Sequence, residues 1–148
     1  MPFRLQKHIV SALNAMGKIL LKRLETPVEF YEKRIINNMQ NLRKEIKKGD
    51  VLLVEGRSKI SSIIQLLTNS SWSHAAFYVG DRLKYSNAKH MKNILNSIRD
   101  EDQDFMLIEA EAGSGVTAVP LNKYKDYNIR ICRPVGISAK DLDSVVNE

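Results

Sequence analysis

The stretch NSSWSHAAFYVGD, residues 69–81, decides the fold because it places a histidine inside an apolar run. The run from Ser73 to Gly80 is short and bounded by polar and glycine residues, which is typical of a strand. Side chains alternate along a strand, so His74, Ala76 and Tyr78 share one face, and the small Ala76 leaves space beside the imidazole. His74 is therefore either a packed core residue or one member of a catalytic pair.

A second apolar strand, predicted over Phe105–Ala112, carries two acids on one face, Glu109 and Glu111. An ionisable carboxylate in an apolar strand is costly unless it is paired. If the two strands are antiparallel neighbours, His74 lies opposite about Ala110, within one residue of both acids. A carboxylate beside an imidazole fixes its tautomer, as for a general base, but structural ion pairs give the same pattern.

Three further residues are candidates for the walls of a cleft around this pair. Trp72 precedes the histidine and either lines the cleft or packs as a core aromatic. Tyr78 shares the face of His74 and is either a hydrogen-bond donor in the site or a half-buried strand tyrosine. Glu111 is the third. A metal site would need His74, Glu109 and Glu111 to converge, and nothing else supports one, so we expect no metal and no cofactor.

The body of the chain is predicted to be α+β, with a mostly antiparallel sheet. Further strands are expected at Val51–Gly56, Val116–Leu121 and Tyr127–Arg133, and helices at residues 58–71 and after Ser138. The sequence AGSG at residues 112–115 is a tight-turn signal, so the strands on either side of it should form a hairpin. The polar residues 81–104 are expected to form a surface excursion with a helical turn.

Basic residues are concentrated at the N-terminus. Residues 1–49 hold 11 Lys/Arg and 4 Asp/Glu, a net +7, whereas the whole chain carries +6. This asymmetry predicts a basic helical arm, residues 1–48, followed by a nearly neutral body, residues 49–148. The arm is expected to form two amphipathic helices separated by Pro27. Their apolar faces comprise Leu5, Ile9, Leu13, Met16, Leu20 and Leu24, and then Val28, Tyr31, Ile35, Met39, Leu42 and Ile46.

Two roles remain open for this arm. Both helices could pack on the body, or the first could lie on an anionic membrane surface. Nucleic-acid binding is not expected, because the basic residues are not interleaved with stacking aromatics. The single cysteine, Cys132, is typical of a reducing compartment, and no secretory signal is recognisable, so we expect a cytoplasmic protein, peripheral at the membrane if the first helix binds lipid.

Four segments in this order and spacing resemble the permuted papain-like cysteine hydrolases, relatives of the NlpC-type amidases, in the YiiX/YaeF-like branch. They are GDVLLVEG (49–56), WSHAAFYVG (72–80), LIEAEAGSGV (107–116) and ICRPVG (131–136). The resemblance implies a small antiparallel sheet or half-barrel with packed helices. It also implies thiolate attack on an amide or related acyl bond of a peptide, cell-wall or other acyl substrate, with His74 as the base and Glu109 as its orienting acid.

The chain departs from that family at the nucleophile, which there lies at the start of a helix downstream of the CRP strand. Cys132 lies inside a predicted strand instead, so we expect it to be structural and the domain to be incomplete at its C-terminus. Two hypotheses follow: a cysteine hydrolase lineage, and a non-catalytic binding or membrane-peripheral module on the same fold. An incomplete body would expose apolar surface, so homo-oligomerisation is a further expectation.

Overall fold

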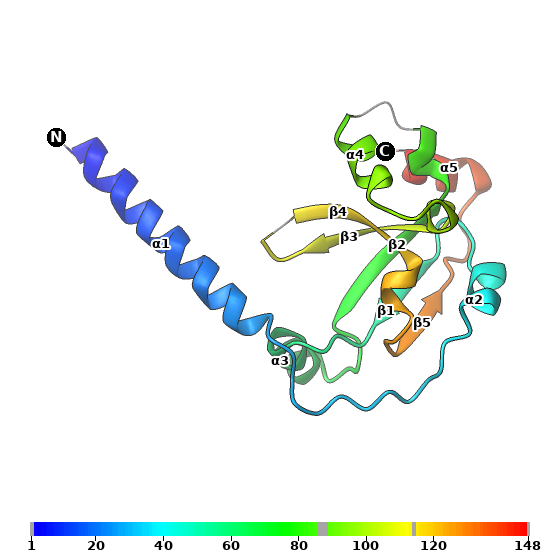
Figure 1. The fold of residues 1–148 in the computed structure, drawn as a ribbon, viewed down its shortest axis with the longest axis horizontal. Coiled ribbons are helices and arrows are strands. Elements are labelled where there is room, and N and C mark those ends of the chain that lie inside the picture. Colours follow the sequence, from blue (N-terminus) through cyan, green and yellow to red (C-terminus); the bar gives the residue numbers. More distant parts are fainter. Residues whose placement is uncertain (1, 86–88, 114, 148) are drawn as a thin grey trace.

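The computed structural model describes residues 2–85, 89–113 and 115–147 (Figure 1). Its centre is one open antiparallel sheet with the strand order β4-β3-β2-β1-β5. The strands are β1 (Val51–Val54), β2 (His74–Gly80), β3 (Met106–Glu111), β4 (Gly115–Pro120) and β5 (Ile129–Cys132). The helices are α1 (Pro2–Leu24), α2 (Met39–Glu45), α3 (Lys59–Thr68), α4 (Lys89–Asn96) and α5 (Ala139–Asn147), with short 3-10 turns η1 (Arg82–Tyr85), η2 (Asp100–Asp102) and η3 (Leu121–Tyr124).

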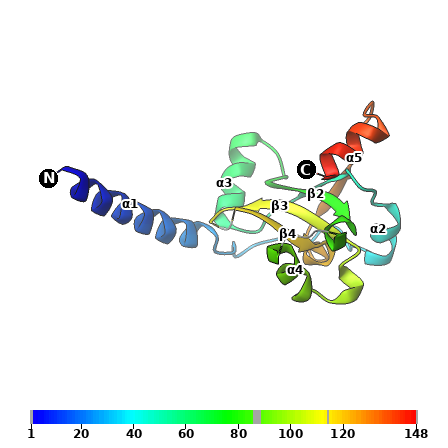
Figure 2. The ribbon, with the colours of Figure 1, turned by 90° about the horizontal axis from the view of Figure 1, so that it is seen from above.

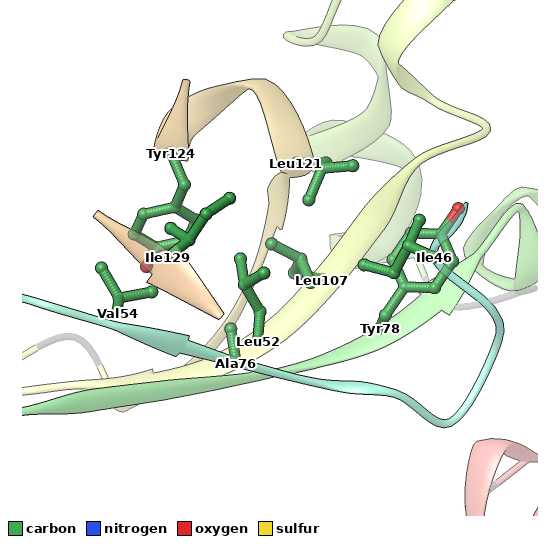
Figure 3. Close-up of a cluster of buried hydrophobic side chains, with 9 residues drawn as sticks. All are labelled: Ile46, Leu52, Val54, Ala76, Tyr78, Leu107, Leu121, Tyr124 and Ile129. Carbon is green, nitrogen blue, oxygen red and sulfur yellow. The ribbon is translucent and has the colours of Figure 1, made fainter. Parts of the chain in front are cut away.

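The main hydrophobic core lies on the face of the sheet that carries His74. Leu52 pairs with Ala76, and Tyr78 pairs with Leu107, so all of these side chains point to one side. Figure 3 shows them beneath Leu121 and Tyr124 of η3, the turn that folds back over the sheet after β4. The other members of this cluster are Ile46, Val54 and Ile129.

A second, smaller cluster covers the opposite face. Val79, Met106 and Ala118 pack there against Leu83 of η1 and Leu95, next to Ile94 and Ile98. Viewed from above, α3 and α4 lie on opposite sides of the sheet (Figure 2). Residues 81–104, predicted as a polar surface excursion with a helical turn, therefore cover this face of the sheet with η1, α4 and η2.

The predicted α+β class and antiparallel sheet are confirmed, and each predicted strand is present, four of them with slightly shorter bounds and β4 shifted by one residue. The predicted hairpin is also confirmed, because β3 and β4 pair along their whole length. Gly113 and Gly115 of its turn have φ of 85° and 75°, a region that glycine enters without strain, while Ser114 lies outside the described residues.

The second predicted helix of the arm is wrong over most of its length. Residues 28–38 run extended along the body, and only α2 is helical. The cause is Asn128, whose Oδ1 accepts bonds from the backbone N–H groups of Arg34 and Ile35, at 2.9 and 3.1 Å. Its Nδ2 donates to the carbonyl of Glu32 at 2.9 Å. These long-range bonds satisfy backbone groups that a helix would have paired internally.

The first predicted helix is confirmed as α1, but it does not pack along the body of the protein. Figure 1 shows it projecting away from the sheet, with only its C-terminal end near α3. Its apolar side chains are therefore largely exposed. Within the described ranges, no helix has the length and apolarity needed to cross a membrane.

Candidate active site

His74 and Glu109 meet at one end of the sheet. The strand register places Ala76 opposite Glu109, so His74 lies diagonally across from the acid and on the same face. His74 Nε2 is 3.0 Å from Glu109 Oε2. Continuing the register places His74 opposite Glu111 rather than the expected Ala110, yet the carboxylate it contacts is that of Glu109.

The Glu109 carboxylate is buried and has three side-chain partners. Its side chain has no exposed surface, whereas the His74 side chain is 26% exposed. Tyr124 donates its hydroxyl hydrogen to the same oxygen that His74 contacts, and Lys123 donates to the other oxygen. Burial alone would raise the pKa of Glu109, but the hydrogen bonds from His74, Lys123 and Tyr124 outweigh it and lower this pKa to about 2.

The ionised acid fixes the tautomer of the imidazole. A carboxylate can only accept hydrogen bonds, so His74 Nε2 carries the proton that it donates to Glu109. In the neutral ring the lone pair then lies on Nδ1, which is free to take a proton. Burial and its bond to Glu109 raise the pKa of Tyr124, so the phenol remains a donor. The arrangement orients the imidazole of His74 with its Nε2 toward Glu109.

A cavity of about 770 Å³ lies beside His74. Its walls come from the end of β1, the start of α3, the β3 end that carries Glu111, and Lys123 and Tyr124. Ser58 begins α3 by accepting a bond from the N–H of Ser61 at 3.2 Å, which brings the first turn of the helix to the cavity. A glycine at position 56 lets this first turn of α3 approach the end of β1 closely, because a Cβ on residue 56 would collide with Ser61 Oγ.

The other predicted cleft residues divide. Glu111 lines the cavity and pairs with Lys123, Nζ to Oε1, at 2.6 Å. Tyr78 does not line it: the side chain is 5% exposed, packs in the main core, and donates a long 3.5 Å bond to the carbonyl of Asp104. Trp72 is half-buried and also does not contribute to this cavity. The expectation that Tyr78 and Trp72 line the site therefore finds no support in the placement of these side chains.

Sequence reasoning missed Lys123 and Tyr124. Both lie on η3, and the expected strand 116–121 gives no sign that the next turn folds back over the sheet. Two acids at alternate positions of one apolar strand require a cation nearby, and Lys123 is the next lysine along the chain after Glu111. The need of Glu109 and Glu111 for a nearby cation is therefore the sequence signal from which Lys123 could have been found.

The site does not have the composition of a metal centre. Within the part of the chain that the structure describes, no three His, Cys, Asp or Glu side chains are grouped to hold a metal ion. Both acids near His74 are paired with Lys123, so their oxygens are already engaged by a cation.

Residues 45–138 match the model of a protein family described as permuted papain-like amidase enzymes, YaeF/YiiX, C92 family. The chain belongs to this family. The match includes all five strands, His74, Glu109 and the turn with Lys123 and Tyr124, and it starts after α1. No curated protein and no solved structure matches the chain.

In a papain-like amidase, the position of the thiol relative to the histidine decides what the site can do. Cys132 is half-buried and pairs with Val51, while His74 pairs with Val54 at the other end of β1. The two residues are two strands and three positions apart, about 14 Å between Cα atoms from ideal strand spacings. They also lie on opposite faces, because Ile129 and Ile131 occupy the His74 face of β5. Cys132 cannot reach His74 in this fold.

Proposed function

We propose that this chain is an amidase-type cysteine hydrolase domain in which His74 is the general base and Glu109 is its orienting acid. The observation that carries the proposal is the 3.0 Å contact between Nε2 of His74, which lines a cavity, and the buried, ionised carboxylate of Glu109. Membership of the papain-like amidase family supports the reaction class. The proposed substrate is an amide or another acyl compound.

The proposed chemistry is acyl transfer to sulfur. His74 Nδ1 takes the proton of a thiol as the sulfur attacks the carbonyl carbon. The tetrahedral intermediate collapses, the leaving amine or alcohol takes that proton from the imidazolium, and a thioester remains. Water then attacks the thioester carbon, with His74 again as the base, and the thiol is released. Glu109 stabilises the imidazolium formed in each step.

Cys132 is not the thiol in this proposal, because it lies on the other face of the sheet. The same observation favours a second candidate function, in which the chain binds an acyl or peptide ligand in the cavity beside His74 without turning it over. The two candidate functions can be distinguished by one measurement. If His74 is a general base, the chain should accelerate acyl transfer to a small thiol supplied from solution. A binding module should not.

The experiment measures release of a chromogenic leaving group from short acyl esters and anilides, with and without 2-mercaptoethanol. We expect the chain to accelerate the thiol-dependent reaction, and His74→Ala to reduce this acceleration by roughly a hundredfold or more, the usual contribution of a positioned base. Cys132→Ser is the matched control and should react like the original chain. Circular dichroism would establish that each variant is folded.

Three results would change the conclusion. Equal acceleration by the original chain and by His74→Ala would show that His74 is not the base. Activity without added thiol that disappears in Cys132→Ser would make Cys132 the nucleophile. Saturable binding of the acyl compounds by calorimetry, with no acceleration under either condition, would favour the binding module.

A further inference from the structure

Helix α1 exposes a continuous apolar face. The side chains of Val10, Leu13, Met16, Ile19 and Leu20 are each between 54% and 61% exposed. Figure 1 shows why: the helix projects from the sheet, and its C-terminal end alone approaches another element. An amphipathic helix normally buries such a stripe against a partner, because exposed apolar surface is unfavourable in water.

Helix α3, which α1 contacts, exposes further apolar side chains. Ile63, Leu66 and Leu67 are 45%, 81% and 79% exposed. We call these three residues and the five of α1 the docking face. Soluble monomers rarely expose so many large apolar side chains on two neighbouring helices unless these bind a partner or a membrane.

The charge of α1 identifies the occupant. Between Pro2 and Leu24 the sequence has five basic residues and no Asp or Glu. Lys18 and Lys22 are exposed and, at 100° per residue, lie on the side of the helix opposite Leu13 and Leu20. An apolar face backed by lysines matches the interface of an anionic bilayer, where lysine stems lie along the apolar region and the ammonium groups meet lipid phosphates.

We propose that the docking face binds the surface of an anionic lipid bilayer, with α1 lying in the interfacial plane. A second copy of the chain fits less well. Paired α1 helices would form no ion pairs with each other, because α1 has basic residues and no acidic residue. Helix pairs in water also use a narrow seam flanked by charges of opposite sign, whereas α1 has a wide apolar face with a basic opposite side.

Docking would bring the candidate active site to the lipid surface. Glu25 and Pro27, which directly follow α1, line the cavity beside His74, as do Ile60 and Ile64 of α3. The cavity residues and the docking-face residues of α3 are therefore neighbours on the same helix, and docking would place the cavity close to the lipid. This inference does not depend on the proposed hydrolase activity.

The test is co-sedimentation of the full chain with vesicles of phosphatidylcholine alone and of phosphatidylcholine mixed with phosphatidylglycerol. Leu13→Gln/Leu20→Gln removes apolar surface without changing the charge, and should weaken binding to mixed vesicles by roughly thirtyfold. Ser11→Gln/Asn14→Gln on the polar side is the matched control, and we expect a change of less than about twofold. Lys18→Gln/Lys22→Gln should weaken binding to mixed vesicles by roughly tenfold to thirtyfold.

Salt and association state complete the test. Raising the salt from ~0.05 to ~0.5 M should weaken binding to mixed vesicles, because screening reduces the attraction between lysines and lipid. The thermal melting of the body should be the same in all variants, since α1 projects from it. Absence of binding to mixed vesicles at low salt would overturn the proposal. So would equal losses in the apolar and control variants, or a dimer, detected by sedimentation, that Leu13→Gln/Leu20→Gln dissociates without any vesicle binding.

Discussion

Asp50 and Glu109 are two buried carboxylates with different partners. They are 1% and 3% exposed, and both have a lowered pKa. Burial would raise the pKa of Asp50, but Arg133 donates to both its oxygens, at 2.9 and 2.8 Å, and reverses that effect. Asp50 thereby joins the start of β1 to the residue after β5. Glu109 instead contacts a histidine at a cavity wall.

The difference shows what a buried acid can and cannot reveal. Burial demands a partner in both cases, because an unpaired carboxylate in an apolar setting is unstable. An arginine partner keeps its charge at any ordinary pH, so the Asp50 pair can only hold strands together. An imidazole partner has a second ring nitrogen that can accept a proton, which the guanidinium of the Asp50 pair lacks.

The largest expected effect separates these two acids by reaction rate. Glu109→Gln should reduce thiol-dependent acyl transfer by roughly a hundredfold or more, because an amide neither orients nor stabilises the imidazolium as a carboxylate does. Asp50→Asn should leave that rate within about twofold, since Asp50 does not line the cavity, while lowering the free energy of unfolding by about 2 kcal/mol, as expected for hydrogen bonds to a charged group. The chromogenic assay and urea unfolding measure the two quantities. Equal rate losses in both variants would show that Glu109 acts only through stability.

The pH dependence of stability is the next largest effect. The pKa of Glu109 falls from 4.5 to about 2 on folding, so the folded state favours the ionised acid. This contributes about 3 kcal/mol to the free energy of unfolding, taking ~1.4 kcal/mol per pKa unit. The contribution is complete above about pH 4.5 and is lost as the pH falls toward 2. We expect Glu109→Gln to be less stable than the original chain at pH 7 and the two curves to converge at acid pH. Parallel curves would contradict the assignment.

The sequence predicted that His74 and Glu109 lie close together because the signals for this contact are local. The alternation of side chains puts His74 and Glu109 on definite faces of their strands, and antiparallel pairing of β2 with β3 brings these faces together. The exact register was one residue off: a pairing of Val79 with Phe105 would place His74 opposite Ala110, whereas the observed pairing of Ala76 with Glu109 places it opposite Glu111. A diagonal contact between long side chains tolerates such a shift.

The extended segment 28–38 was not predictable in the same way. Its apolar residues have helical spacing, but the side chain of Asn128, far along the chain, forms hydrogen bonds with its backbone groups. Asn37 adds to this by donating to the carbonyls of Tyr124 and Tyr127, at 3.3 and 2.7 Å. Such long-range bonds carry no periodic signal. Helix propensity is a weak preference that tertiary contacts override.

The smallest expected effect tests how much the hydrogen bond from Tyr124 contributes to the lowered pKa of Glu109. Tyr124→Phe removes one hydrogen bond to the carboxylate and keeps the ring in the main core, so it should lower the free energy of unfolding by about 1 kcal/mol. It should also raise the pKa of Glu109, because the remaining bonds from His74 and Lys123 oppose burial less strongly. The stability lost on acidification should then begin at a higher pH than in the original chain. Tyr127→Phe is the matched control, since no bond joins its hydroxyl to Glu109, and it should leave the midpoint of that loss unchanged. If Tyr124→Phe also leaves it unchanged, His74 and Lys123 alone hold the acid ionised.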